Sequence, residues 1–270
     1  TTSVAGIACV LPAIAMQALL KRPALLAGGG VAYVGGVVLA YEYVSPKVPL
    51  PSACERCRTF NALAPGYDAE IERDEASSGI LELRRDIASY AKGKVLEVAG
   101  GTGRNLAFYT KAVSELLVTD FSQEMLKVGA GKVAKLRAAE GGAPGLSNVT
   151  LAVVDAATLP LESAQYDTVV DSFGICSFEE PQAVLEEMKR CCKPSGSILL
   201  LEHGVSSWGI ISWWQQRRLN RHVGRWGCYW NRDILGIVKA AGLRVVELRR
   251  SNFGTIYFIR CQRPDAPPDD

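Results

Sequence analysis

The chain has 270 residues, of which 48% are hydrophobic and 21% are charged, and its formal net charge is +2. This length allows one α/β domain of about 200 residues and an extension. A net charge so near zero excludes the overall basic surface of a nucleic-acid-binding domain, so we expect no nucleic-acid partner.

The first 44 residues differ in composition from the rest of the chain. Residues 24–41 form an uncharged apolar run, long enough to cross a thin bilayer. Residues 4–20 form a second apolar run that Pro12 interrupts, and it is either a second span or an interfacial helix. We therefore predict a membrane-anchoring helical segment over residues 1–44.

Small residues occur at every fourth position of the longer apolar run, at Gly28, Ala32, Gly36 and Ala40. In lipid, such a stripe lets a second helix approach closely, so it predicts packing against other subunits of a membrane complex. The chain begins with Thr1 rather than Met, which suggests that an organelle presequence has been removed.

Residues 45–57 are expected to form a stiff linker, because prolines stand at positions 46, 49 and 51. Cys54 and Cys57 form a single C-x-x-C pair within this linker. A zinc site needs further ligands, and the whole chain has only two histidines. We therefore predict no metal site and interpret the pair as two plain thiols.

Residues 94–98 form an apolar strand that runs directly into a glycine-rich loop, residues 99–105. Such glycines let the backbone approach a ligand, and Asp120, at the tip of the next strand, can accept hydrogen bonds from ribose hydroxyls. The loop lacks the third glycine of a dinucleotide fold and the Lys-Ser/Thr of a phosphate-binding loop. With Glu97 before it and Asn105 at its end, the loop favours S-adenosylmethionine (SAM).

The following strands repeat the arrangement. Residues 148–156 predict a third strand that ends at Asp155 and Ala156, where a carboxylate and a backbone N–H could read adenine. A fourth strand and its exit loop are expected over residues 166–177, followed by a helix at 185–192 and a fifth strand at 197–202. A last helix is expected at 231–241, and two antiparallel strands at 243–248 and 255–260 close the sheet.

At this point the chain resembles the class I SAM-dependent methyltransferases of the ubiquinone/menaquinone C-methyltransferase type. The motifs that carry the resemblance are VLEVAGGTGRN, VTDFSQEML, VVDAATLP, YDTVVDSFGICSFEEP and CKPSGSILLLEHG. The chain is also similar to two membrane-attached branches, the alkyl-thiol methyltransferases and a mitochondrial inner-membrane family implicated in cytochrome oxidase maintenance.

The resemblance implies a Rossmann-like α/β sheet of seven strands, mostly parallel with the last strand antiparallel, over residues 58–264, followed by a tail at 265–270. It also implies SAM or S-adenosylhomocysteine as cofactor and a location in the mitochondrial inner membrane. The cofactor-binding residues that it implies are Tyr67, Glu97, Ala99, Gly101, Gly103, Asn105, Asp120, Phe121, Asp155 and Ala156.

Ala99 departs from the family pattern, which usually has glycine at this position. A methyl group there is tolerated if φ is negative, and it costs about 1 kcal/mol if φ is positive.

Residues 208–230 contain all five tryptophans of the chain. In a helix, Arg217, Arg221 and Arg225 would form one row, although Gly224 and Gly227 weaken that prediction. A basic, tryptophan-rich amphipathic segment suits contact with membrane lipid or a partner subunit. The alternatives are a lid over the acceptor and simple packing on the domain.

Candidate proton-accepting groups at the carboxyl edge of the sheet are Asp171, Cys176, Glu202 and His203, and we favour His203 and Glu202 as catalytic. Two functions remain open. The first is a membrane-anchored methyltransferase that acts on a small or lipophilic acceptor, quinone-like or thiol. The second is a methyltransferase-fold accessory subunit of a mitochondrial respiratory-chain complex with reduced or lost catalysis.

Overall fold

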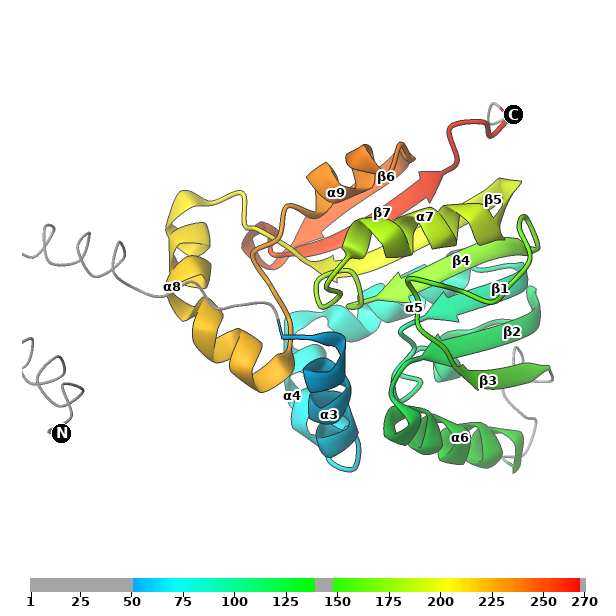
Figure 1. The fold of residues 1–270 in the computed structure, drawn as a ribbon, viewed down its shortest axis with the longest axis horizontal. Helices are drawn as coiled ribbons and strands as arrows, with labels where there is room; N and C mark the ends of the chain where they lie inside the picture. The colour runs from blue at the N-terminus through cyan, green and yellow to red at the C-terminus, as the bar shows by residue number, and fades with distance from the viewer. Residues whose placement is uncertain (1–50, 139–147, 268–270) are drawn as a thin grey trace, which may run out of the picture. The chain divides into compact units, whose positions relative to one another are not determined.

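A seven-stranded sheet with the order β3-β2-β1-β4-β5-β7-β6 forms the centre of the computed structural model, which describes residues 51–138 and 148–267 (Figure 1). β7 pairs antiparallel with both of its neighbours, whereas β3, β2, β1, β4 and β5 pair in parallel. The predicted, mostly parallel α/β sheet is confirmed. Its strands are Gly93–Val98, Val113–Asp120, Val149–Val153, Tyr166–Ser172, Cys192–His203, Arg244–Ser251 and Ile256–Gln262, numbered β1 to β7.

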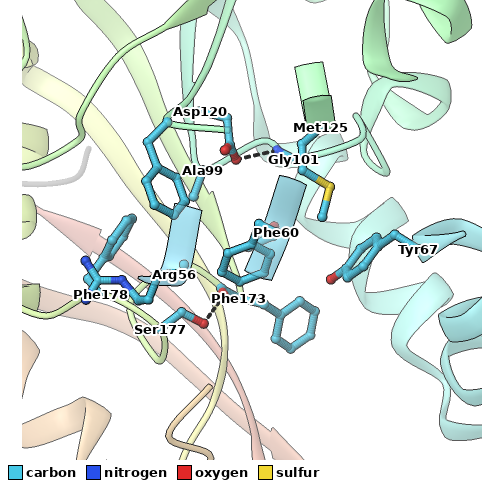
Figure 2. A pocket seen from close by; sticks show the side chains of 13 residues that line it. Arg56, Phe60, Tyr67, Ala99, Gly101, Asp120, Met125, Phe173, Ser177 and Phe178 are labelled. Carbon is cyan, nitrogen blue, oxygen red and sulfur yellow. Dashed lines mark hydrogen bonds between the residues drawn. The ribbon is translucent and has the colours of Figure 1, made fainter. Parts of the chain in front are cut away.

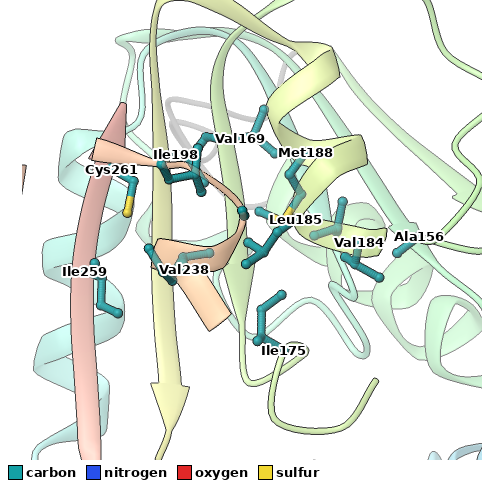
Figure 3. Packing of buried hydrophobic residues seen from close by; sticks show 14 of the residues in the cluster. Ala156, Val169, Ile175, Val184, Leu185, Met188, Ile198, Val238, Ile259 and Cys261 are labelled. Carbon is teal, nitrogen blue, oxygen red and sulfur yellow. The ribbon is translucent and has the colours of Figure 1, made fainter. Parts of the chain in front are cut away.

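Helices cover both faces of the sheet because both sides of the strands are apolar. In β4, Val169 packs into one core and Val170 into the other, as the alternation of side chains along a strand requires. The Val169 side holds α7 (Pro181–Cys191) and α9 (Ile234–Ala240), and Figure 3 shows α7 inserting Leu185 and Met188 toward the strands. The opposite side holds α5 (Ile80–Tyr90) and α6 (Gln123–Ala138).

The parallel register brings the functional strand ends to one edge. Val98 at the end of β1 lies beside Asp171 of β4, and Asp120 at the end of β2 lies beside Val153 of β3. Residues that follow these strands therefore meet at the carboxyl edge of the sheet, where α/β folds bind ligands.

Helix α3 (Ala53–Leu63) begins inside the range expected to be a linker, so the boundary of 45–57 is wrong for residues 53–57. A capping box explains the early start. The Glu55 amide donates to Ser52 Oγ (3.3 Å), and the Ser52 amide donates to Glu55 Oε2 (2.8 Å). Proline stiffens the chain only as far as residue 51, and the cap then starts the helix.

Helix α8 (Gly209–Trp226) forms most of the tryptophan-rich segment and ends at Gly227, whose φ of +64° suits glycine. Gly224 lies within the helix and does not break it. Gln215 and Val223 are buried on its inner face, whereas Arg217, Arg221 and Arg225 are exposed, so the predicted row of arginines is present. In Figure 1, α8 stands beyond the carboxyl edge of the sheet.

Among the helices that the structure describes, none has the length and apolar character needed to cross a bilayer. The two apolar runs at 4–20 and 24–41, and the stripe of Gly28, Ala32, Gly36 and Ala40, lie outside the described residues. Residues 1–49 and 50–270 form two separate units.

Candidate functional site

A narrow pocket opens at the carboxyl edge of the sheet, below helices α3 and α4 (Tyr67–Ser78) (Figure 2). Its wall combines the glycine-rich loop, the end of β2 and the loop that leaves β4. The lining residues include Arg56, Phe60, Tyr67, Ala99, Gly101, Asp120, Phe121, Met125, Phe173, Gly174 and Ser177.

Most of the predicted cofactor residues line this pocket or an adjoining one. Tyr67, Ala99, Gly101, Asp120 and Phe121 line the first. Asp155 and Ala156 line the adjoining cavity, and Ala99, Asp120 and Phe121 are among the residues that line both cavities. The ends of β1, β2 and β3 thus contribute to one continuous region, as a nucleoside that spans the sheet edge requires.

Asp120 is the carboxylate at the centre of this region. Its Oδ2 accepts the Gly101 amide (2.9 Å) and its Oδ1 accepts the Ser122 amide (2.8 Å). Burial raises the pKa of Asp120 to about 6, although these backbone N–H groups act in the opposite direction. Each oxygen keeps a lone pair for a ribose hydroxyl, so the residue fits the cofactor.

Gly101 leaves room for a ligand above the loop. A Cβ built on this residue would meet only the Ala99 carbonyl oxygen, at 4.0 Å, and its φ of +56° is one that glycine adopts without strain. Ala99 also has a positive φ, +49°. Of the two cases considered for its methyl group, this is the strained one. That methyl lies close to Gly174, where an added Cβ would come within 2.8 Å of it.

Glu97, Asn105 and Gly103 do not line the pocket but hold the loop from beneath. The Asn105 amide nitrogen (2.9 Å) and the Tyr109 hydroxyl (2.8 Å) both donate to the buried Glu97 carboxylate. Burial raises the pKa of Glu97 to about 7. At Gly103, an added Cβ would approach Leu106 Cδ1 to 2.3 Å, so glycine is needed for packing.

A network of ion pairs, which the sequence reasoning missed, ties α4 to the glycine-rich loop. Glu75 is only 5% exposed and binds both Arg84 (2.7 Å) and Arg104 (2.7 Å). Arg84 also donates to the Asn105 side-chain oxygen (3.0 Å), and Asp68 accepts a hydrogen bond from Thr102 (2.7 Å). The signal for this network was the acidic run over 68–75, in which Arg73 is the one basic residue beside five acidic ones.

Helix α3 covers the cofactor region closely. The Phe60 and Phe121 rings meet edge to face with centroids 6.0 Å apart, and Arg56 donates to the Pro51 carbonyl (3.0 Å). The remaining cavity of about 70 Å³ is far smaller than the roughly 300–1,000 Å³ of typical ligand pockets. Cofactor binding therefore requires movement of side chains or of α3 itself.

A larger, apolar cavity of about 590 Å³ lies between α8 and the turn η4 (Asn252–Gly254). Ile210, Trp213, Trp214 and Phe253 line it, and His203 contributes a polar group to its wall. These apolar side chains are unusually open, since Ile210 is 73% exposed and Phe253 is 63% exposed. The structure thus places the predicted catalytic His203 at a cavity with room for an apolar molecule.

Glu202 lies elsewhere and lines neither of these cavities. It is fully buried, and it accepts the backbone N–H groups of Cys176 (3.0 Å) and Ile175 (3.3 Å), which anchors the loop after β4. Burial raises the pKa of Glu202 to about 8, and burial together with the Glu202 carboxylate raises that of Asp171. In this structure the two carboxylates accept backbone N–H groups of the loop after β4 and line neither cavity.

Helices α4 and α8 contact each other at the mouth of the pocket. Tyr67 of α4 meets Trp226 of α8 edge to face, with ring centroids 6.3 Å apart. Arg225 pairs with Glu70 of α4. His222 of α8 stacks on Trp230, which follows the helix, with ring centroids 4.0 Å apart, and burial lowers the pKa of His222 to about 4.

Comparison with known proteins relates this arrangement to methyltransferases. Residues 96–200 match a family model described as "Methyltransferase domain". The protein named "Methyltransferase OMS1, mitochondrial" from Saccharomyces cerevisiae is 31% identical over 215 residues, which cover 76% of this chain and 45% of that protein. A ubiquinone/menaquinone biosynthesis C-methyltransferase, UbiE, from Rubrivivax gelatinosus is 34% identical over 158 residues and 57% of each chain. The chain spans about half the length of these curated relatives.

Solved structures share the fold at low sequence identity. The [4+2]-cyclase SpnF has a TM-score of 0.62 at 15% identity, covering 80% of this chain and 98% of its own. A complex of DhpI with SAH has a TM-score of 0.56 at 19% identity, covering 79% and 96%. Because a cyclase shares the fold, the fold alone does not identify the reaction. The family model and the curated relatives relate this chain to the SAM-dependent methyltransferases.

Proposed function

We propose that this chain transfers a methyl group from SAM to a small lipophilic acceptor, quinone-like or thiol, at a membrane surface. The observation that carries the proposal is the apolar cavity beside the cofactor region. Its exposed Trp213, Trp214 and Phe253 suit an apolar acceptor, and His203 offers it a polar anchor. The ubiquinone/menaquinone C-methyltransferase relative supports a quinone-type acceptor, and the mitochondrial yeast protein supports a mitochondrial location.

In this reaction SAM supplies the methyl group on a sulfonium, which is already a good leaving group, so the protein contributes mainly alignment and exclusion of water. Asp120 would bind the ribose, and the open face of Gly101 would accommodate the rest of the cofactor. Phe173 packs on His203 with ring centroids 4.5 Å apart and also lines the cofactor pocket. It thus lies between the two ligand-binding regions.

The anchoring part of the proposal concerns α8 and the segment before the domain. Trp208, Trp213 and Trp214 are exposed, and the Arg217 and Arg218 guanidinium groups lie over the Trp213 and Trp214 rings. Aromatic rings beside arginines suit the lipid headgroup layer. We favour an enzyme over an accessory subunit because Gly101, Asp120 and Asp155 meet in one region.

Methyl transfer from labelled SAM to a panel of quinols, phenols and alkyl thiols in detergent tests the proposal. The full chain should methylate at least one class, and Trp214→Ala should lower kcat/KM for it by about tenfold, because part of the acceptor's apolar contact is lost. Leu248→Ala removes an apolar side chain that is 40% exposed on β6 and should leave the rate unchanged. No transfer to any lipophilic acceptor, with SAM bound, would contradict the proposal.

A further inference from the structure

Three side chains of the types that can ligate metals meet beside the cofactor region and the apolar cavity, although they are far apart in the sequence. Cys176 follows β4, His203 ends β5 and Cys228 follows α8. Their donor atoms all lie within 4.8 Å of one another. The two Sγ atoms are 3.2 Å apart, and His203 Nδ1 lies 3.6 Å from Cys228 Sγ and 3.9 Å from Cys176 Sγ.

We propose that Cys176, His203 and Cys228 form a binding site for a zinc ion. Tetrahedral zinc with bonds of about 2.3 Å to sulfur and about 2.0–2.1 Å to nitrogen would space its ligands by about 3.8 Å between sulfurs and about 3.6 Å between sulfur and nitrogen. Both sulfur–nitrogen distances already match within a few tenths of an ångström. The two sulfurs need to separate by about half an ångström, which a small rotation of either thiol side chain achieves.

The ligand set selects the metal. Two thiolates and an imidazole suit zinc, whereas Mg²⁺ and Ca²⁺ prefer oxygen ligands. Three protein ligands leave a fourth tetrahedral position, which is the pattern of a catalytic zinc and not of a closed structural one. His203 also lines the apolar cavity, so a water molecule or the heteroatom of an acceptor could occupy that position.

Hydrogen bonds hold the two cysteine-bearing loops in place before any metal binds. The Tyr229 amide donates to the Cys176 carbonyl (2.9 Å), which joins the two cysteine-bearing loops. Glu202 accepts the Cys176 amide, and Arg232 donates to the Ile175 carbonyl (2.8 Å). Cys176 and Cys228 are 0% and 6% exposed. Such fixed positions favour binding because little ordering remains for the metal to impose.

Metal analysis of the full chain, purified without a histidine tag and then titrated with Zn²⁺ alone, tests this inference. We expect one zinc per chain. Cys228→Ser and His203→Gln should each weaken Zn²⁺ binding by more than about 100-fold, beyond the effect of losing an outer partner of a ligand. Cys261→Ser removes another buried cysteine, outside the cluster, and should bind zinc as the parent does.

Cobalt substitution provides a readout that does not depend on the variants. Co²⁺ added to the unaltered chain should produce the near-ultraviolet charge-transfer band of thiolate coordination, and Cys54→Ser/Cys57→Ser should retain it. The inference is overturned if the unaltered chain binds no zinc or if the band disappears only in the Cys54/Cys57 variant. A Cys176–Cys228 disulfide that persists, without bound metal, in protein purified in the presence of a thiol reductant would also overturn it. Because all of these measurements are independent of methyl transfer, they separate this inference from the proposed function.

Discussion

The cofactor region and the apolar cavity beside α8 are lined by different kinds of side chains, although both lie at the carboxyl edge of one sheet. Around the cofactor region, charged groups are buried and paired, with Glu75, Arg84 and Arg104 connected beneath α4. Around the apolar cavity beside α8, aromatic rings and isoleucines dominate and much of the apolar surface is open. A cofactor of constant shape can be met by a fixed polar frame, whereas a lipophilic acceptor has to enter through an apolar surface.

The difference predicts that substitutions on the cofactor side act on stability and cofactor affinity, while those on the acceptor side act on attachment and turnover. The following changes test that division.

Glu75→Gln should have the largest effect, because it leaves Arg84 and Arg104 without their buried counter-charge. We expect the free energy of unfolding to fall by roughly 3–5 kcal/mol, as for other broken buried pairs. Urea denaturation followed by tryptophan fluorescence measures it. The control Glu82→Gln breaks an exposed pair with Arg85 and should cost less than about 1 kcal/mol. Equal losses in the two variants would show that the buried network does not stabilise the domain.

Asp120→Ala should weaken cofactor binding by roughly 2–4 kcal/mol, since two charge-assisted hydrogen bonds to the ribose are lost. Calorimetric titration with S-adenosylhomocysteine measures the change. Asp86→Asn, on the outer surface of α5, is the matched control and should bind as the parent does. Unchanged affinity in Asp120→Ala would place the cofactor elsewhere.

Arg217→Glu/Arg221→Glu should weaken binding of residues 50–270 to anionic vesicles by more than tenfold, because each basic residue near such a surface contributes about 1 kcal/mol. Vesicle sedimentation measures the partition. Arg85→Glu/Lys127→Glu makes the same change of charge on α5 and α6 and should have less effect. If both double variants lose binding equally, net charge and not α8 governs attachment.

Glu202→Gln should alter how stability depends on pH. The folded pKa of Glu202 is raised by burial to about 8, so the folded state holds a proton that the unfolded chain releases near pH 4.5. The stabilisation from this proton is present below pH 4.5 and is lost as the pH rises toward 8. The parent should therefore lose stability relative to the variant by at most about 1.4 kcal/mol per pH unit. Urea midpoints at pH 5 to 9 measure it, and parallel curves would contradict the shift.

Ala99→Gly should have the smallest effect. Relief of the positive φ should raise the free energy of unfolding by about 0.5–1 kcal/mol. Thermal denaturation beside Ala138→Gly, which replaces an alanine at the last residue of α6, separates this local gain from a general effect of glycine. A loss of stability in Ala99→Gly would mean that packing of the methyl against Gly174 outweighs the strain.

The sheet, the glycine-rich loop and Asp120 were predictable because strand ends and the residues that follow them are encoded locally. The cap at Ser52 and Glu55 could also have been predicted from the Ser-x-x-Glu pattern. The prolines before it led to the prediction of a linker over these residues instead. The contacts of Glu75 were not readable, because its partners lie 9 and 29 positions away on other elements.

The cluster of Cys176, His203 and Cys228 also could not be predicted from a local sequence motif. The adjacent Cys54 and Cys57 drew attention as a motif, yet Cys54 is exposed and the Cys57 sulfur contacts the Phe121 carbonyl (3.8 Å). Cys176 and Cys228 are 52 positions apart and meet only because β4 and the end of α8 reach the same edge. No local spacing records such a meeting, so the expectation of no metal site, which rested on Cys54 and Cys57, did not consider this cluster.

The contact between α4 and α8 couples the free energies of the cofactor region and of α8. Glu70 and Tyr67 of α4 hold Arg225 and Trp226 of α8, and the same α4 carries the ion pairs to the glycine-rich loop. A lipid or partner that repositions α8 therefore shifts the free energy of α4 and with it the affinity for SAM. Linkage is reciprocal, so binding of the cofactor would change the affinity of α8 for that lipid or partner by the same factor. The turnover state of the domain and its residence at the membrane would then be coupled quantities.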